Sequence, residues 1–406
     1  MSELHLLSPR GFRAGGAYAG IKSRQINDVG ILLCDDPSGA TAAAAFTTNQ
    51  VFAAPIAIGR KHVADGRLRA IVVNSGNANA CTGKQGLADA FAMCKLAAAQ
   101  LGCKPAHVLP SSTGIIGHHL PMAKVARGIV EASQDLGDSS DHALAFADAI
   151  LTTDTRRKSA AATVKIGRAT ATIAGICKGA GMIGPRLALG ERHATMLAYL
   201  TTDAQISAPA LRKLLAPAVN RSFNAVTIDD HTSTNDTAAI LASGAGDAKI
   251  STIAAAKKFL AALTDVCQSL ARQIAADGEG ATKVVRVEVT RAAGDRDAHL
   301  IARAIANSPL VKCAMHGNDP NWGRIVSAAG MCGARFDPDR ATLKLQSVPV
   351  FTRGRPAAFD PAAVSAALAA SEVVVALDCG QGKSSATVWT CDLSKEYVTI
   401  NADYHT

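Results

Sequence analysis

The 406-residue sequence has few aromatic side chains and few charges: aromatic residues make up 4% of the chain, and Asp, Glu, Lys and Arg together make up 18%. Its formal net charge of +9 is spread thinly, with no long run of like charge. A surface that binds nucleic acid needs clustered Lys and Arg. The pattern therefore favours an ordinary basic surface, or a small anionic substrate, and we expect no nucleic-acid partner.

Closely spaced cysteines are also missing. None of the ten cysteines stands in a C-x-x-C pair, so we expect neither a disulfide framework nor a zinc site. We expect these thiols to be reduced, mostly buried, small apolar side chains. The first 15 residues contain no apolar core of a signal peptide, and no long apolar run is free of polar residues. These absences predict a cytoplasmic protein with no membrane partner and no metal.

Alanine and glycine are abundant, and 48% of the residues are hydrophobic. A chain of this length buries a large core and favours two lobes over one. Strand-like and helix-like patterns alternate without a Gly/Ser-rich linker, so we expect an α/β fold with two intertwined lobes. The patterns predict strands at residues 30–34, 69–73, 284–290, 372–377 and 397–401. They predict helices around residues 87–98, 259–274 and 361–370.

Several short segments are dense in polar residues. NSGNANACTG (residues 74–83) directly follows a predicted strand, and PSSTGIIG (residues 110–117) follows another apolar run. Each segment is consistent with a tight turn, but so many in one chain favour a polar cavity. Within the second segment, Thr113 and Gly114 offer a hydroxyl and a main-chain N–H to a developing oxyanion. Further polar segments are residues 150–155 and 200–204, expected at strand ends, and residues 222–237 and 317–325.

The segment KGAGMIGPRLALGERHATMLAYLTTDA (residues 178–204) contains the G-x-G-x-x-G spacing of a dinucleotide-binding turn at Gly179, Gly181 and Gly184. A true dinucleotide turn leads directly into a helix whose N-terminus holds the pyrophosphate. Here residues 189–192 would interrupt any helix that begins after Gly184. The next regular stretch, residues 196–201, is strand-like. A nicotinamide-dependent oxidoreductase therefore remains only as an alternative that rests on three glycines.

Thr195 offers a different chemistry. It follows Ala194 and enters a predicted strand after a Gly-rich segment. If the Ala194–Thr195 bond is cleaved, the new α-amine lies beside the Thr195 hydroxyl. An α-amine with a pKa of about 7.7–8.0 suits the role of general base for that nucleophile.

These segments together resemble the ornithine acetyltransferase (glutamate N-acetyltransferase) family of arginine biosynthesis. The resemblance implies an αββα-type sandwich, similar in outline to N-terminal-nucleophile hydrolases. It also implies self-cleavage between Ala194 and Thr195 into an α chain (residues 1–194) and a β chain (residues 195–406) that fold together. The matching segments span nearly the whole chain: 74–83, 112–117, 152–155, 178–185, 194–204, 222–237, 277–283, 321–325 and 400–406.

The resemblance also implies roles for individual residues. Thr195 is similar to the nucleophile that takes the acetyl group as an ester, and Thr113 and Gly114 are similar to the oxyanion-hole pair. The residues that resemble the family's substrate-binding set are Thr152, Lys178, Thr195, Glu279, Asn401 and Thr406. Among them, Lys178 can pair with a substrate carboxylate and Glu279 with an ammonium or the leaving amine.

The implied reaction is a ping-pong transfer of the acetyl group of N2-acetyl-L-ornithine to L-glutamate, without a metal or other cofactor. Some members of the family also use acetyl-CoA as donor. The α and β chains are expected to associate, as a heterotetramer of two of each. A self-processing aminopeptidase or amidase is the alternative that shares the nucleophile, with water as the acceptor.

The chain departs from the family pattern at one place. The family joins its Gly-Met-Ile-x-Pro segment to Ala-Thr by a short connection, whereas residues 186–193 add several residues here. We expect this insertion either to project harmlessly into solvent or to slow self-cleavage.

Overall fold

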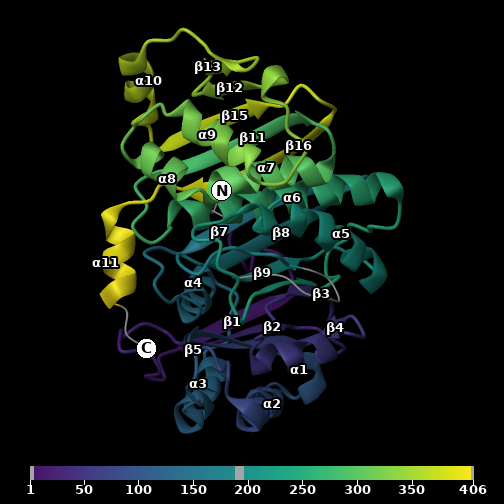
Figure 1. Ribbon diagram of the computed structural model, residues 1–406. Helices are drawn as coiled ribbons and strands as arrows, with labels where there is room; N and C mark the ends of the chain where they lie inside the picture. The colour runs from purple at the N-terminus through teal and green to yellow at the C-terminus, as the bar shows by residue number, and fades with distance from the viewer. Residues whose placement is uncertain (1–3, 188–195, 404–406) are drawn as a thin grey trace. The chain divides into compact units, whose positions relative to one another are not determined.

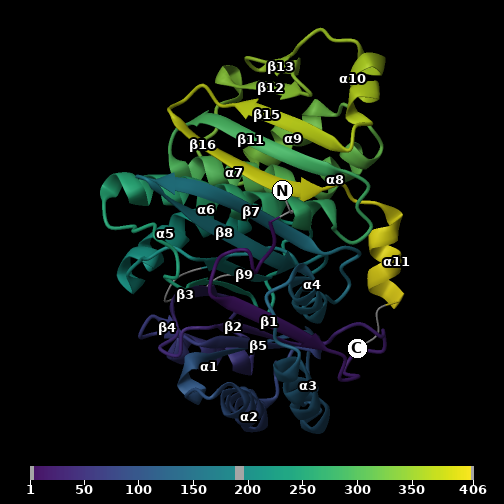
Figure 2. The same cartoon turned by 180° about the vertical axis from the view of Figure 1, so that it is seen from behind.

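The computed structural model describes residues 4–187 and 196–403 (Figures 1 and 2). Residues divide into two compact units. Unit 1 comprises residues up to 224 together with residues 231–270, and unit 2 comprises residues 225–230 and 271–405. The chain passes between the units after residues 224, 230 and 270, so the units are interleaved along the sequence, as expected for intertwined lobes. Each unit is described by itself below.

Two β-sheets form the centre of unit 1. In the four-stranded sheet β5 (Ala70–Asn77) and β6 (Val108–Ile115) are parallel. In the six-stranded sheet β9 (Leu197–Thr202) and β10 (Thr237–Ala242) are parallel, and the other neighbours with a described register are antiparallel. The first sheet has the order β1 (Phe12–Ala17), β2 (Val29–Cys34), β5 (Ala70–Asn77), β6 (Val108–Ile115). The second has the order β4 (Arg67–Leu68), β3 (Ala40–Phe46), β10 (Thr237–Ala242), β9 (Leu197–Thr202), β8 (Ala169–Lys178), β7 (Lys158–Ile166).

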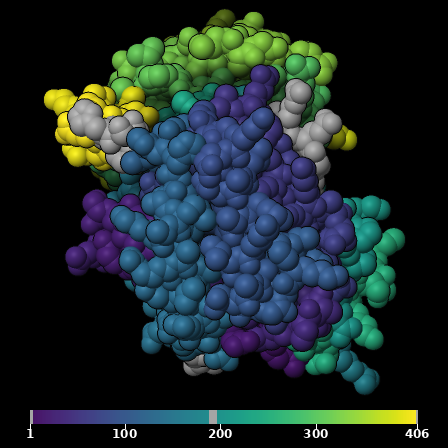
Figure 3. Space-filling model, turned by 90° about the horizontal axis from the view of Figure 1, so that it is seen from below, coloured from purple at the N-terminus to yellow at the C-terminus, as the bar shows by residue number. Residues whose placement is uncertain are grey.

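Helices cover the outer faces of both sheets. Three of them, α1 (Ala54–His62), α2 (Gly83–Leu101) and α3 (Met122–Gln134), contact the four-stranded sheet and fill the centre of the view in Figure 3. On the other side, α5 (Ala208–Asn220) contacts β3. The long helix α6 (Ile253–Ala276) brings Leu270 against Gly175 of β8. The layers of unit 1 are thus helix, sheet, sheet, helix, which confirms the predicted αββα-type sandwich.

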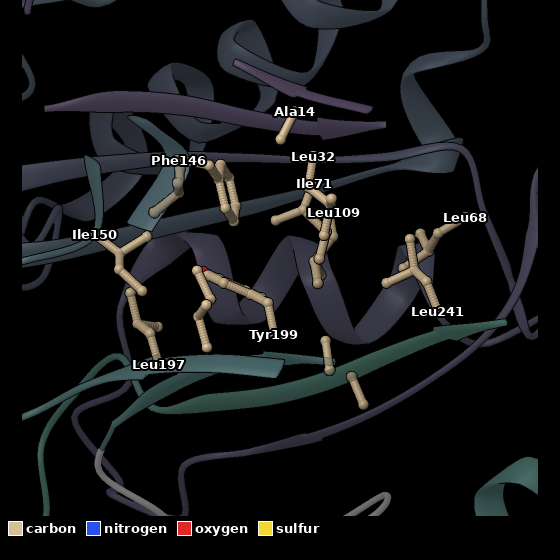
Figure 4. Packing of buried hydrophobic residues seen from close by; sticks show 14 of the residues in the cluster. Ala14, Leu32, Leu68, Ile71, Leu109, Phe146, Ile150, Leu197, Tyr199 and Leu241 are labelled. Carbon is tan, nitrogen blue, oxygen red and sulfur yellow. The ribbon is translucent and has the colours of Figure 1, made fainter. Parts of the chain in front are cut away.

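The main core of unit 1 lies between the two sheets. Figure 4 shows Leu32 and Ile71 of one sheet facing Leu197, Tyr199 and Leu241 of the other. Helix α4 (Ser140–Ala149) adds side chains at the end of this core. A second cluster lies between the four-stranded sheet and helices α2 and α3. Burial of apolar surface in both layers fixes the sheet edges from which the polar loops project.

Strand β3 has the sequence ATAAAAF, and all but one of its residues are buried. Alanine favours helices in isolation. In this protein the run forms a strand because residues 41–46 pair with β10, with Ala43 opposite Ile240. Alternate side chains of the strand, Ala40, Ala42 and Ala44, lie in the core between the sheets, where tertiary packing overrides local propensity.

Unit 2 contains one six-stranded sheet with helices packed against it. Helix α7 (Asp295–Asn307) contacts β11 (Val284–Ala292) and β16 (Ser384–Cys391). Helices α8 (Pro309–His316) and α9 (Trp322–Gly330) contribute to the same apolar core. Helix α10 (Pro361–Leu368) adds Val364 and Leu368. The sheet has the order β14 (Arg355–Pro356), β13 (Val348–Thr352), β12 (Thr342–Leu345), β15 (Glu372–Asp378), β11 (Val284–Ala292), β16 (Ser384–Cys391).

Most of the predicted elements are confirmed, with differences that have physical reasons. The strands predicted at residues 30–34, 69–73, 284–290 and 372–377 correspond to β2, β5, β11 and β15, and the predicted helices to α2, α6 and α10. On α2, Leu87 and Phe91 are exposed, while Ala90, Met93 and Ala97 are buried.

Two predicted strand segments are wrong. Residues 397–401 lie in helix α11 (Lys395–Asp403), which begins where the Ser394 hydroxyl accepts a hydrogen bond from the Glu396 N–H at 3.2 Å. The β-branched residues of this segment suggested a strand, but none of the described strands pairs with it. Residues 150–155 are not a strand end either, since they form the loop between α4 and β7. Residues 200–204 do end a strand, β9.

Across residues 4–187 and 196–403, no helix is long and apolar enough to cross a membrane.

Candidate active site

Thr113 and Gly114 lie near the carboxyl end of β6, which runs parallel to β5. In this register Ser75 is opposite Thr113 and Gly76 is opposite Gly114. The carboxyl ends of parallel strands meet at the same edge of a sheet, where α/β proteins commonly bind ligands. The fold therefore brings the two predicted oxyanion-hole residues beside the polar loop of residues 74–83.

Gly114 is required by close backbone approach. It has a φ of +131°, and a Cβ atom at this position would lie 2.3 Å from the main-chain carbon of Gly76. Any side chain would force the two strand ends apart. The glycine thus keeps the main chain of β6 tight against β5 at the point where the oxyanion donor is predicted.

Buried side-chain hydrogen bonds hold this edge in one conformation. The Ser112 hydroxyl donates to Asn74 Oδ1 at 2.6 Å, and Asn74 Nδ2 donates to the Asn77 carbonyl at 2.9 Å. The Asn79 N–H in turn donates to Asn77 Oδ1 at 2.8 Å. Asn74, Asn79 and Ser112 are almost completely buried. Pre-organisation of this kind is what a site needs if its donors are to stabilise a transition state.

Lys178 is the last residue of β8, and its side chain is only 11% exposed. Its neighbour across the sheet is Leu197, which points into the core between the two sheets (Figure 4). Directly opposed residues of adjacent strands share a face. The Lys178 ammonium therefore lies on the inner face of the six-stranded sheet, with Nζ 4.0 Å from Asp154 Oδ2.

Asp154 links Lys178 to Thr152. This completely buried carboxylate accepts hydrogen bonds from Lys158 Nζ at 2.6 Å, the Gly179 N–H at 2.7 Å and the Thr152 N–H at 3.1 Å. Burial by itself raises the pKa of Asp154, but the Lys178 and Lys158 charges and these hydrogen bonds outweigh it and lower the pKa to about 2. Asp154 is thus ionised and positions both predicted substrate-binding residues.

Lys22 links Asp154 and its partners to the sheet edge that carries Thr113 and Gly114, called the oxyanion edge below. Its Cγ atom lies 2.9 Å from the position of a Cβ atom on Gly76, and its Nζ donates to the Leu151 carbonyl at 3.1 Å. The Ser75 hydroxyl donates to the Ala149 carbonyl at 2.7 Å. Burial lowers the pKa of Lys22 to about 8, although the nearby Asp28 and Asp148 carboxylates oppose this shift. The predicted residues Thr113, Gly114, Thr152 and Lys178 therefore belong to one neighbourhood of unit 1.

Asn235 and Asp236 complete this neighbourhood. Asn235 Nδ2 donates to the carbonyls of Ala78 at 2.6 Å and Ser112 at 2.8 Å. Asp236 is 2% exposed and lies close enough to Lys178 for their charges to interact. We name Thr113, Gly114, Thr152, Asp154, Lys178 and Asp236 the unit 1 site.

Glu279 and Asn401 lie in unit 2, where they contact each other. Asn401 Nδ2 donates to Glu279 Oε2 at 2.9 Å across the short gap between the end of α6 and helix α11. The close approach depends on Gly280, because a Cβ atom there would lie 2.4 Å from the Tyr397 nitrogen. Within unit 2 the structure thus brings these two predicted substrate-binding residues together.

Three predicted site residues, Ala194, Thr195 and Thr406, lie outside the described residues, as does most of the inserted segment of residues 186–193. The glycines of the G-x-G-x-x-G spacing are described. Residues 179–187 follow β8 without forming a helix, so these glycines do not open the helix that a dinucleotide turn requires. In the described part of the chain no group of three or more His, Cys, Asp or Glu side chains is arranged to hold a metal ion.

Asp154, Asn235 and Asp236 are site residues that no sequence motif identifies. All three stand in the polar segments noted above, within T-T-D-T and S-T-N-D-T. The available signal was an acidic or amide residue within a run of hydroxyl residues next to a predicted strand. Burial is what distinguishes them, and burial depends on contacts between distant segments.

Comparison with known proteins gives the same family over almost the whole chain. The model of the ArgJ family matches residues 13–406. Two similar relatives are the arginine biosynthesis bifunctional proteins ArgJ of Dehalococcoides mccartyi and Symbiobacterium thermophilum. Each is 46% identical, over 99% and 98% of this chain and 97% and 98% of the relative, respectively. The crystal structure of the arginine biosynthesis bifunctional protein ArgJ from Bacillus halodurans has a TM-score of 0.50 and 39% identity, and covers 52% of this chain and 100% of that chain.

Proposed function

Because this chain belongs to the ArgJ family of arginine biosynthesis, we propose that it transfers the acetyl group of N2-acetyl-L-ornithine to L-glutamate through an acetyl ester on Thr195. The observation that carries this proposal is the family match over residues 13–406 together with the pre-organised strand edge at Thr113 and Gly114. An enzyme of acyl transfer needs such an edge to stabilise the oxyanion of its tetrahedral intermediate.

In the proposed reaction the Thr195 hydroxyl attacks the acetyl carbonyl, and its proton passes to the Thr195 α-amine. The Thr113 hydroxyl and the Gly114 N–H stabilise the oxyanion. The C–N bond then breaks, the ornithine nitrogen takes the proton from the α-ammonium, and L-ornithine leaves. The neutral amine of L-glutamate then attacks the ester carbonyl and gives a proton to the Thr195 α-amine. The ester C–O bond breaks, the Thr195 oxygen takes that proton back, and N-acetyl-L-glutamate leaves.

The substrate carboxylate is assigned to Lys178. Its ammonium is buried, and the Asp154 carboxylate 4.0 Å away is shared with Lys158 and the Gly179 N–H. A charge-assisted contact in such a place contributes about 1.5–3 kcal/mol. Thr152 is assigned to the same substrate, and Glu279, Asn401 and Thr406 remain predicted substrate-binding residues.

The proposal includes self-cleavage between Ala194 and Thr195. Its support is the solved Bacillus halodurans chain, which is matched over its whole length by only 52% of this chain, whereas the full-length relatives match almost all of it. Edman sequencing of the purified protein is expected to yield a second N-terminus, Thr-Met-Leu-Ala-Tyr. The variant Thr195→Ala is expected to stay uncut and inactive, and Thr195→Ser to cleave slowly. An active wild-type chain that is never cut would refute this part.

The activity itself is tested by incubating the protein with N2-acetyl-L-ornithine and L-glutamate. The proposal predicts equal amounts of L-ornithine and N-acetyl-L-glutamate. Free acetate in place of N-acetyl-L-glutamate would instead support an amidase or aminopeptidase with the same nucleophile. Absence of any reaction in fully processed protein would contradict the proposal.

Use of acetyl-CoA as a second acetyl donor is a further candidate function. It is favoured by the description of the relatives as bifunctional. This activity is tested directly by incubating the protein with acetyl-CoA and L-glutamate. The free thiol that is released and the N-acetyl-L-glutamate that forms are both measured. The association of α and β chains as a heterotetramer, and the cytoplasmic location, remain predictions.

A further inference from the structure

The segment Asn235–Asp236–Thr237 is fixed at the centre of unit 1 by its neighbours on three sides. Asn235 binds the carbonyls of Ala78 and Ser112, as described above. The Thr237 N–H donates to the Met196 carbonyl at 2.7 Å, and the Asp236 carbonyl accepts from the Thr47 N–H at 2.9 Å. The main chain of Asp236 therefore has little freedom, and its buried side chain lies close enough to Lys178 for their charges to interact.

Two buried aspartates lie near Lys178, and their surroundings differ. Asp154 receives three hydrogen bonds from N–H donors. For Asp236, in contrast, Oδ2 is buried and has no hydrogen-bond partner among the residues that the structure describes. A carboxylate with one buried oxygen that no donor reaches is disfavoured in an apolar interior, whereas a carboxylic acid is tolerated. Two carboxyl groups with such unlike surroundings can adopt different protonation states.

We propose that Asp236 is a neutral carboxylic acid in the resting protein, so that the buried group of Lys158, Asp154, Lys178 and Asp236 keeps one net positive charge to receive the substrate carboxylate. This inference rests on the proposed function for its ligand, but not for the protonation state itself. Asp236 acts here through Lys178, as a residue that sets the charge of the binding site.

The charge of this group decides what it can bind. Two lysines and the ionised Asp154 leave a net charge of +1, which one substrate carboxylate neutralises. If Asp236 were ionised, the group would already be neutral, and a bound carboxylate would leave an uncompensated buried negative charge. Burial raises the pKa of Asp236 well above its usual value, although the Lys178 charge and main-chain hydrogen bonds from Asp236 and Ser233 oppose the shift.

The other charged side chains near Asp154 have hydrogen-bond partners of their own. Lys22, the other cation near Asp154, donates to the main-chain carbonyls of Asn27, Asp148 and Leu151. Asp28 accepts main-chain N–H groups of residues 19, 21 and 22, and Asp148 binds Arg157. Among the described charged groups, Lys178 is the one that interacts with Asp236.

Infrared spectroscopy tests the protonation state without any assay of activity. The wild-type protein at neutral pH is expected to show the carbonyl stretching band of a buried carboxylic acid, which carboxylates lack. This band is expected to disappear at high pH and to be absent from the Asp236→Asn variant. Asp203→Asn is the matched control, since Asp203 is also buried but accepts the Thr172 N–H at 2.9 Å. Absence of the band from the wild-type protein at neutral pH would overturn the inference.

The second measurement is the KM for N2-acetyl-L-ornithine as a function of pH. In the wild-type enzyme and in Asp203→Asn, KM is expected to rise at least about tenfold as Asp236 ionises, the loss expected for one charge-assisted contact. Titration of Lys22 affects all variants alike. The Asp236→Asn variant, which cannot ionise at this position, is expected to lack the rise. The same rise in Asp236→Asn would overturn the inference. A wild-type protein that shows the carboxylic acid band but has no transferase activity would contradict only the proposed function.

Discussion

Replacement of Lys178 by methionine is the most direct test of how the proposed substrate is held. Methionine keeps most of the length and apolar volume of the lysine side chain but removes its charge. The ammonium lies 4.0 Å from Asp154, which is a long ion pair, and Asp154 keeps its shorter bonds to Lys158, Gly179 and Thr152. The folded structure should therefore survive the change with a modest loss of stability.

The effect on substrate binding is expected to be larger. Loss of a charge-assisted contact worth about 1.5–3 kcal/mol corresponds to a rise in KM for N2-acetyl-L-ornithine of roughly ten- to 150-fold. Because the oxyanion edge at Thr113 and Gly114 belongs to other strands, kcat should change much less than KM.

The assay is steady-state transfer to L-glutamate, with the melting temperature and the extent of chain cleavage measured on the same samples. Lys165→Met is the matched control, because Lys165 lies on the neighbouring strand β7 and is exposed. The control should have wild-type KM. If Lys178→Met is folded and cut normally and keeps the wild-type KM, Lys178 does not bind the substrate carboxylate, and the assignment is refuted.

Three further results follow from the unit 1 site. Thr113→Ala should lower kcat by about 10²–10³-fold with the fold retained, measured by steady-state kinetics; wild-type kcat would remove Thr113 from the mechanism. Gly114→Ala should lower both the melting temperature and kcat, because its Cβ atom would lie 2.3 Å from Gly76. The Asp154 pKa of about 2 lies below the unfolded value of about 3.9, so Asp154 contributes roughly 2–3 kcal/mol of stability above about pH 4, which is lost as the pH falls towards 2. Acid unfolding of Asp154→Asn should lack this contribution, and an unchanged acid transition would contradict it.

The prediction from sequence was accurate where a side-chain pattern repeats within one segment. Residues 259–274 repeat apolar side chains at helical spacing and form α6, and residues 284–290 form β11. Periodicity of this kind reports which face of an element is buried, whatever lies opposite. The short polar segments were also recognisable, since Asn, Ser and Gly after a strand indicate a loop with few alternatives.

Other features depended on partners that the local sequence does not name. The alanine-rich strand β3 and helix α11 both contradict their local propensities, the former because it pairs with β10 and the latter because none of the described strands pairs with it. Local preferences are worth only tenths of a kcal/mol per residue, so pairing and burial outweigh them.

The sequence by itself determined the family, the order of most elements, and the residue types of the site, because these are carried by motifs and periodicities along the chain. Asp154 and Asp236 are both aspartates in similar polar segments. Only the tertiary structure decided that three hydrogen-bond donors stabilise the ionised form of Asp154, while Asp236 has an oxygen with no described partner. The physical reason is that the charge state of a buried group depends on the donors and charges around it, and in this fold those come from strands and loops far apart in the chain.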